Sequence, residues 1–386
     1  MRKLYILLIL IFYCSVVPCA GNERIELYTL STGDPVYRQN TCVVIAFKQP
    51  RTVLGTSVIN GGYREDLKAI FNHDMKDAVM NADSYPEYMQ GVARNLGLDP
   101  DRVSGMGTGA SMDNVAIQSA SYQTLTVTAI ATGGVEENGG RVGDPAEYFN
   151  PGQKTRLHKP GTINIMLVID ADIPPGTLAR ALVTCTEAKT AALQELMAGS
   201  KYSSGLATGS GTDQTIIIAN PGSPLYLEDA GKHSKLGELI GRTVKQAVKE
   251  ALFRQTGLSP QKQHSVLRRM NRFGLTEETL YQEYLQKNGY LEKQRFLDCL
   301  QQLDKDPRLV TYTSLYVHLL DQFNWQLLSG DETVAAGNEL LLLSAGKFGV
   351  LPRAIAAEAK LENCIQAWSG LVVDILRAKL AGSQGD

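Results

Sequence analysis

The sequence lacks the charge imbalance of proteins that bind nucleic acid. Its 386 residues include 38 lysines and arginines against 40 aspartates and glutamates, a formal net charge of −2 at pH 7. Because binding to phosphates requires a concentrated positive surface, this balance excludes nucleic acid as an expected partner. The hydrophobic content of 44 % is enough for packed cores, and the length suits two domains.

Close spacings of metal-binding or redox residues are also missing. Four cysteines follow residue 21, and none has a second cysteine at short spacing: Cys42, Cys185, Cys299 and Cys364. Among residues 22–254, His73, His158 and His233 form no His-x-His or His-x-x-x-His pair. We therefore expect no metal and no cofactor, with ligands assembled from distant segments as the alternative. The cysteines are expected to be buried free thiols, or to pair in an oxidising compartment.

No hydrophobic run reaches the ~20 residues that a membrane span needs. Residues 1–21 nevertheless start with the basic Met1-Arg2-Lys3 and continue with the apolar run Leu4–Val17, which is typical of a secretory signal. We expect export to the periplasm or another extracytoplasmic compartment. Cleavage of this segment is the favoured outcome, and an uncleaved segment that anchors the protein to a membrane is the alternative.

The rest of the chain divides into two parts with different patterns. Residues 22–254 combine β-like runs with helical stretches, whereas residues 255–386 show repeated helical periodicity. In the first part strands and helices come in groups, which favours an α+β layered domain with a mixed or antiparallel sheet over a Rossmann-type sheet. The second part is predicted to be an all-α domain whose role the sequence does not indicate.

Local patterns predict individual elements. Strands are expected at 25–30, 42–47, 52–58, 124–130, 162–170 and 215–219. In the first part, helices are expected at 64–81, 85–96, 175–197 and 232–252. In the second part, they are expected at 275–286, 291–303, 314–328, 332–344 and 353–379. Residues 136–160 carry glycine, proline and charge without periodicity and are predicted to form a long functional loop.

Three glycine-rich polar segments offer backbone N–H groups that bind anions or oxyanions, at residues 105–111, 207–213 and 231–238. None is a Walker loop, because no Gly-Lys-Ser/Thr follows at the required spacing. Each segment alone is equally well a tight turn. Glu187, on the predicted helix 175–197, belongs either to a solvated face or to a pocket where it acts as a general base.

Five segments of the first part, taken together, resemble the motifs of a known family. They are TSVINGG at 56–62, TGGVE at 132–136, TCTEAKTAALQ at 184–194, ATGSGTD at 207–213 and GKHSKLGELIG at 231–241. In content and order they resemble the adenosylcobinamide amidohydrolase family, over about residues 23–254. The resemblance implies a small-molecule corrinoid substrate. The implied reaction hydrolyses the amide joining aminopropanol to the corrin ring, giving adenosylcobyric acid for cobamide salvage.

Amide hydrolysis needs a nucleophile, donors to the oxyanion and a proton for the departing amine. We predict that His233 transfers the proton, because an imidazole titrates near neutrality, with Glu187 or Asp213 orienting it or acting as base. The candidate nucleophiles are Thr208, Ser210 and Thr212. The residues expected to contact the substrate are Asn60, Gly61, Gly62, Thr132, Gly133, Glu136, Lys189, Thr208, Gly209, Gly211, Lys232 and Lys235.

Two other functions fit the same sequence. One is an exported corrinoid-binding accessory protein without catalysis, and the other is an amidase of another class that acts on peptides or envelope components. Only an enzyme forms product from adenosylcobinamide, and a panel of peptides separates the two kinds of amidase.

Overall fold

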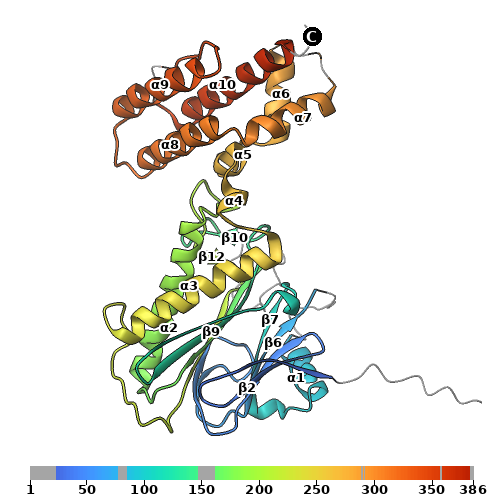
Figure 1. Cartoon of the computed structure of the whole chain (residues 1–386), viewed down its shortest axis with the longest axis vertical. Helices are drawn as coiled ribbons and strands as arrows, with labels where there is room; N and C mark the ends of the chain where they lie inside the picture. Colours follow the sequence, from blue (N-terminus) through green and yellow to red (C-terminus); the bar gives the residue numbers. More distant parts are fainter. Residues whose placement is uncertain are drawn as a thin grey trace, which may run out of the picture.

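The computed structural model describes residues 23–76, 85–146, 161–287, 290, 292–356 and 359–382. A layered α+β domain comes first and a helical domain follows, stacked on one end of it (Figure 1). The predicted fold class is therefore confirmed for both parts of the chain. The predicted signal at residues 1–21 and much of the predicted loop, at 147–160, lie outside the described residues.

The first domain contains two large sheets. The six-stranded sheet has the order β5 (Gly62–Arg64), β4 (Thr52–Gly55), β13 (Gln214–Ala219), β11 (Ile163–Ile169), β9 (Leu125–Gly133) and β8 (Ala116–Tyr122). The five-stranded sheet has the order β1 (Arg24–Thr29), β2 (Pro35–Gln39), β3 (Cys42–Ala46), β6 (Ala69–Asp74) and β7 (Val103–Thr108). Both are mixed, because β11 runs parallel to β13 and β6 runs parallel to β7. A short pair, β10 (Gly139–Gly140) and β12 (Gly209–Ser210), lies at one end.

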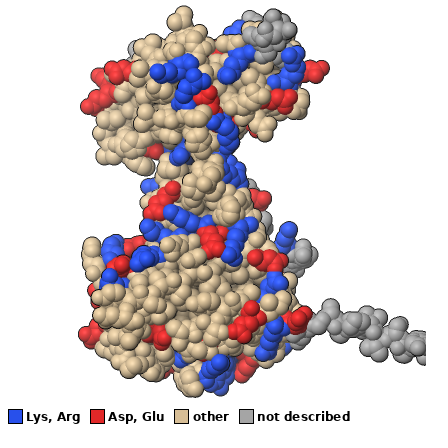
Figure 2. All heavy atoms as spheres, in the orientation of Figure 1, with Lys and Arg blue, Asp and Glu red and all other residues tan. Residues whose placement is uncertain are grey.

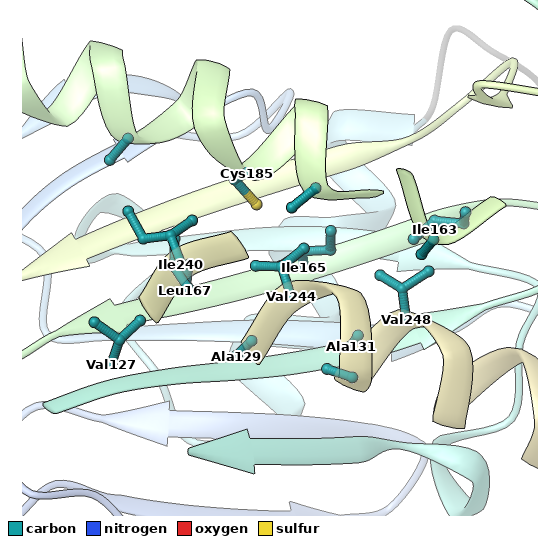
Figure 3. Packing of buried hydrophobic residues seen from close by; sticks show 14 of the residues in the cluster. Val127, Ala129, Ala131, Ile163, Ile165, Leu167, Cys185, Ile240, Val244 and Val248 are labelled. Carbon is teal, nitrogen blue, oxygen red and sulfur yellow. The ribbon is translucent and has the colours of Figure 1, made fainter. Parts of the chain in front are cut away.

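Helices cover the outer faces of the two sheets and complete four layers. On the six-stranded sheet, α2 (Pro175–Glu195) and α3 (Lys235–Thr256) bury Leu167 and Val244 in one apolar layer (Figure 3). On the five-stranded sheet, α1 (Tyr85–Asn95) buries Met89 against Phe71. Each fully buried side chain of this size contributes about 1.5–3 kcal/mol relative to exposure, so apolar burial holds the layers together.

The inner faces of the sheets pack directly on each other. Met166, Val168 and Ile216 of the six-stranded sheet meet Val43 and Ile70 of the five-stranded sheet in a single core cluster. Because alternate residues of a strand point to opposite faces, each of these strands contributes every second side chain to this layer. At the end where β11 and β13 begin, this inner layer also carries buried polar side chains, among them Thr132 and Asn164.

One predicted element of the first domain is wrong. Residues 64–81 were expected to form a helix, but the structure places Gly62–Arg64 in β5 and Ala69–Asp74 in β6. Residues 69–73 are buried on both sides, between the inner core and α1. Periodicity alone does not distinguish such a short buried run from a helix, which explains the error.

The second domain consists of helices. They are α4 (Pro260–Gln263), α5 (Val266–Met270), α6 (Glu277–Gln286), α7 (Lys293–Asp304), α8 (Pro307–Asn324), α9 (Gly330–Gly346) and α10 (Leu361–Gly382). Tyr316 stacks on the fully buried Trp368 with 4.4 Å between ring centroids. None of the described helices is both long and apolar enough to cross a membrane.

Polar contacts connect the second domain to the first. Gln263 donates its Nε2 to the carbonyl of Leu196 at 2.6 Å, and Arg272 donates to the carbonyl of Ser204. Arg272 also forms a bidentate ion pair with Asp321, and both side chains are nearly fully buried. Basic and acidic side chains gather around this junction (Figure 2).

Candidate functional site

A row of polar side chains crosses the six-stranded sheet where β11 and β13 begin. In the strand register, Asn164 of β11 lies beside Thr132 of β9 and beside Gln214 of β13. Strand alternation puts these three on the face that also carries Ile130 and Met166. That face packs against the five-stranded sheet, so the polar side chains are enclosed between the two sheets.

Ser57, two residues after the end of β4, is the fourth polar residue on this face of the sheet. The backbone N–H of Thr56 donates to the carbonyl of Thr215, and the N–H of Thr215 donates to Thr56 Oγ1, both at 3.0 Å. The next residues along these two antiparallel segments are Ser57 and Gln214. We call these four residues the polar row: Ser57, Thr132, Asn164 and Gln214.

Hydrogen bonds from the opposite sheet hold the middle of the polar row. Asn72 of β6 donates to Thr132 Oγ1 at 2.7 Å and accepts from Asn164 Nδ2 at 2.8 Å. Asn164 Nδ2 also donates to the carbonyl of Gly107 on β7 at 3.0 Å. Asn72 and Asn164 are almost completely buried, so this paired network fixes the spacing of the two sheets.

Two atoms of the polar row have no hydrogen-bond partner among the described residues, Ser57 Oγ and Gln214 Oε1. The amide of Gln214 binds the hydroxyl of Tyr85, and burial raises the pKa of that tyrosine. Ser57 is only 8 % exposed. An unpaired buried polar group costs about 1–3 kcal/mol, and proteins retain such groups mainly where function requires them.

Asp213, immediately before β13, anchors the turn beside the polar row. Its carboxylate forms an ion pair with Lys189 of α2, and it accepts hydrogen bonds from Ser210 Oγ at 2.6 Å and from the N–H of Ile163 at 2.8 Å. The side chains of Lys189 and Asp213 are each 11 % exposed. A Cβ on Gly209 would lie 2.3 Å from Asp213 Oδ2, so glycine is needed there. Asp213 was predicted to orient His233 or to act as base, and that role stays a prediction; the structure shows its contacts to Lys189, Ser210 and Ile163.

The neighbouring predicted threonines are also engaged. Thr212, a candidate nucleophile, donates its hydroxyl to the carbonyl of Gly161 at 3.1 Å. Thr208 accepts from the N–H of Val142 at 2.9 Å. Gly211 is exposed at the tip of the turn. Hydrogen bonds thus hold the turn 208–213 to Val142 at its start and to Gly161 near its end.

The motif at 56–62 forms a tight return beside Ser57. Asn60 donates its Nδ2 to the carbonyls of Pro100 and Val103 at 2.7 and 2.8 Å. A Cβ on Gly61 would lie 2.1 Å from the carbonyl oxygen of Ser57, and Gly62 has a φ of +79°. Asn60, Gly61 and Gly62 shape the return that follows Ser57, and their expected contact with the substrate stays a prediction.

The motif at 132–136 contributes Thr132 to the polar row, and its other members point elsewhere. A Cβ on Gly133 would lie 3.3 Å from Ile163 and 3.5 Å from Leu252, so Gly133 is packed closely between these two side chains. Glu136 forms ion pairs with Lys262 and Arg268, each at 3.1 Å, on the wall of a cleft of about 640 Å³ between the domains. Burial raises the pKa of Glu136, but Arg268 and Lys262 outweigh it and hold that pKa below its ordinary value.

Glu136 therefore predicts a pH dependence. A depressed pKa in the folded state means that the ion pairs stabilise the protein above the ordinary glutamate value of 4.5 and that this contribution is lost as the pH falls below it. We expect Glu136→Gln to lower the melting temperature at neutral pH and to have a smaller effect at about pH 3. A difference from wild type that does not change with pH would contradict this role.

The remaining predicted residues lie on the far side of α2. Glu187 pairs with Lys232 at 2.9 Å, and both side chains are about half exposed. His233 is exposed in the same loop, and Lys235 pairs with Glu238 at 2.5 Å. Residues two apart on a helix lie about 200° apart around its axis, so Glu187 and Lys189 occupy opposite sides of α2. The structure does not bring His233 to Asp213 or to the polar row.

Sequence reasoning missed Asn72, Asn164 and Gln214, and it quoted Ser57 only as part of a motif. A signal was available, because Asn164 lies two residues before Met166, and Gln214 lies two residues before Ile216. A polar residue that continues the apolar face of a strand is a candidate for a buried site.

Metal-ligand groups are not found in the described part of the chain, where no three His, Cys, Asp or Glu side chains gather. Cys42, Cys185, Cys299 and Cys364 are free. Burial raises the pKa of Cys42 and of Cys185 to about 12, so these thiols stay protonated at neutral pH.

Comparison with known proteins gives a family and one curated relative. Residues 27–260 match the family model described as adenosylcobinamide amidohydrolase. An uncharacterized protein of Methanocaldococcus jannaschii is 34 % identical over 237 residues, which cover 58 % of this chain and 89 % of that protein.

Solved structures are similar only at a low level. The PH0078 protein of Pyrococcus horikoshii gives a TM-score of 0.30 at 14 % identity, over 66 % of this chain and 92 % of that one. The L-aminopeptidase D-Ala-esterase/amidase of Ochrobactrum anthropi gives a TM-score of 0.29 at 12 % identity, over 60 % of this chain and 82 % of that one. On the evidence of the family match and the curated relative, the chain belongs to the adenosylcobinamide amidohydrolase family, whose name implies amide hydrolysis on a corrinoid.

Proposed function

We propose that the protein hydrolyses the secondary amide joining aminopropanol to the corrin ring of adenosylcobinamide, giving adenosylcobyric acid for cobamide salvage. The observation that carries this proposal is the convergence of four family motifs on one end of the first domain. Ser57 and Thr132 belong to two of them, and the Lys189–Asp213 ion pair joins the other two. The fifth motif, with His233, lies beyond α2.

The polar row has the chemistry that such a reaction requires. Hydrolysis adds water to R–CO–NH–R′ and gives a carboxylate and an ammonium, so charge develops on the carbonyl oxygen in the transition state. Fixed hydroxyl and amide groups between two apolar sheets act in a low dielectric, where they stabilise charge more than they do in water. At the same end of the domain, Lys189 of α2 forms an ion pair with Asp213, immediately before β13.

The proposal is tested by mass spectrometry of adenosylcobinamide incubated with residues 23–386. We expect adenosylcobyric acid and free aminopropanol to appear in equal amounts, and none with heat-denatured protein. Adenosylcobinamide that remains intact while it binds the protein would support the corrinoid-binding accessory protein instead. Hydrolysis of a peptide panel without attack on adenosylcobinamide would support an amidase of another class.

We also propose export through residues 1–21, on the basis of the basic start and apolar run. The mature protein would act outside the cytoplasm, or remain at the membrane if this segment is not cleaved. Fractionation of cells that express the full chain with a C-terminal tag tests this, because cytoplasmic recovery at unchanged mass rejects both outcomes.

A further inference from the structure

The unpartnered atoms of the polar row are concentrated in one place. Four buried side-chain nitrogen or oxygen atoms of the described residues have no hydrogen-bond partner, and two of them, on Arg269 and Trp368, belong to the helical domain. The other two are Ser57 Oγ and Gln214 Oε1, on adjacent segments of one sheet. Asn164 and Thr132, in the same row, each have a hydrogen bond to Asn72.

The neighbour of Ser57 on the same face of the sheet is a glycine. Gly55, Ser57 and Val53 share the inner face of the sheet, since they are two residues apart along the strand. A Cβ on Gly55 would lie 3.2 Å from Ile216 and 3.8 Å from Ser57 Oγ, so a side chain at position 55 would press on both residues. The Ser57 hydroxyl is buried in this layer and has no hydrogen-bond partner among the described residues.

The two free atoms match the hydrogen-bonding capacity of a secondary amide. Such an amide has one N–H donor and one carbonyl acceptor, whereas a serine hydroxyl donates and a glutamine oxygen accepts. We propose that Ser57 and Gln214 hold the reacting amide of the substrate, with Ser57 Oγ donating to its carbonyl oxygen and Gln214 Oε1 accepting from its N–H. This assignment rests on the proposed function and names the residues that contact the amide.

Ser57→Ala gives the first test, because binding and folding are expected to respond in opposite directions. Removing an unpaired buried hydroxyl is expected to leave the melting temperature unchanged or raise it. The same change should lower kcat/KM for adenosylcobinamide about ten- to a hundredfold, while Ser57→Thr, which keeps a hydroxyl, retains most of it. A lower melting temperature with unchanged kcat/KM would show that Ser57 is structural and overturn the proposal.

Ser104→Ala is the matched control. Ser104 is also a buried serine, but its hydroxyl donates to the carbonyl of Ile59 at 3.1 Å. We expect this variant to lower the melting temperature and to leave kcat/KM unchanged. The same pattern in Ser57→Ala and Ser104→Ala would contradict a special role for Ser57.

Equilibrium binding separates this proposal from the proposed reaction. Adenosylcobinamide and adenosylcobyric acid share the corrin ring, but only the first carries the secondary amide to aminopropanol. Ser57→Ala and Gln214→Leu should each weaken adenosylcobinamide binding about tenfold or more and leave adenosylcobyric acid binding unchanged. If the wild-type protein binds adenosylcobinamide but does not hydrolyse it, only the proposed reaction is rejected. The loss of binding in these two variants would still support the amide contact. Equal weakening for both ligands, or none, would reject the amide contact.

Discussion

Replacing Asp213 with alanine is expected to lower the free energy of unfolding by about 3–5 kcal/mol, the usual cost of removing one partner from a buried ion pair. The variant leaves the ammonium of Lys189 without its carboxylate, at a site where each side chain is 11 % exposed. It also removes the acceptor of Ser210 Oγ and of the Ile163 N–H. Denaturant unfolding of the purified variant measures the loss.

Glu187→Ala is the control on the same helix. Glu187 pairs with Lys232, but these side chains are 46 % and 55 % exposed, so solvent screens the interaction. We expect a change within about 1 kcal/mol. Similar losses for Asp213→Ala and Glu187→Ala would show that burial does not distinguish the two pairs.

Gly61→Ala is expected to destabilise the protein by about 1–3 kcal/mol or more, as overpacking does in a tight site. The added Cβ would lie 2.1 Å from the carbonyl oxygen of Ser57, and a backbone atom moves only with its segment. Because Ser57 belongs to the polar row, kcat/KM for adenosylcobinamide should fall together with the melting temperature. Thermal unfolding and steady-state kinetics on one preparation measure both.

Gly91→Ala provides the matched glycine. Gly91 lies inside α1, and a Cβ there meets nothing within 4 Å. Alanine is favoured over glycine in a helix by roughly 0.5–1 kcal/mol, so this variant should be slightly more stable than wild type and equally active. If Gly61→Ala behaves like Gly91→Ala, the motif at 56–62 does not depend on a close backbone approach.

Much of the fold was predictable because the signals are local. Alternation at 124–130 and the apolar run at 162–170 correspond to β9 and β11, and the tail's periodicity corresponds to α6 through α10. The last helix, expected from residue 353, begins only at Leu361, because residues 351–356 form no regular structure. The prediction of a helix at 64–81 was wrong because the structure of this segment depends on distant parts of the chain. Whether Ala69–Asp74 is a strand depends on β3 and β7, its neighbours in the sheet, and not on its own pattern.

The candidate site was predictable only in part. The motifs pointed to Thr132, Lys189 and Asp213, which the structure places at one end of the first domain. The partner of Asn164 is Asn72, 92 residues away in the chain, and only the packing of the two sheets brings them together. His233 is attractive for its chemistry, but its exposure on the far side of α2 depends on how that helix packs.

The most direct test of where the reaction occurs is to measure the turnover of adenosylcobinamide by three proteins. These are wild type, His233→Ala and Ser57→Ala. If the polar row holds the amide, His233→Ala should keep kcat/KM within a few-fold of wild type, since His233 lies beyond α2, and Ser57→Ala should lose about ten- to a hundredfold. A loss of about 100-fold or more in kcat for His233→Ala, with Ser57→Ala unchanged, would place the chemistry at the other motif and contradict this account.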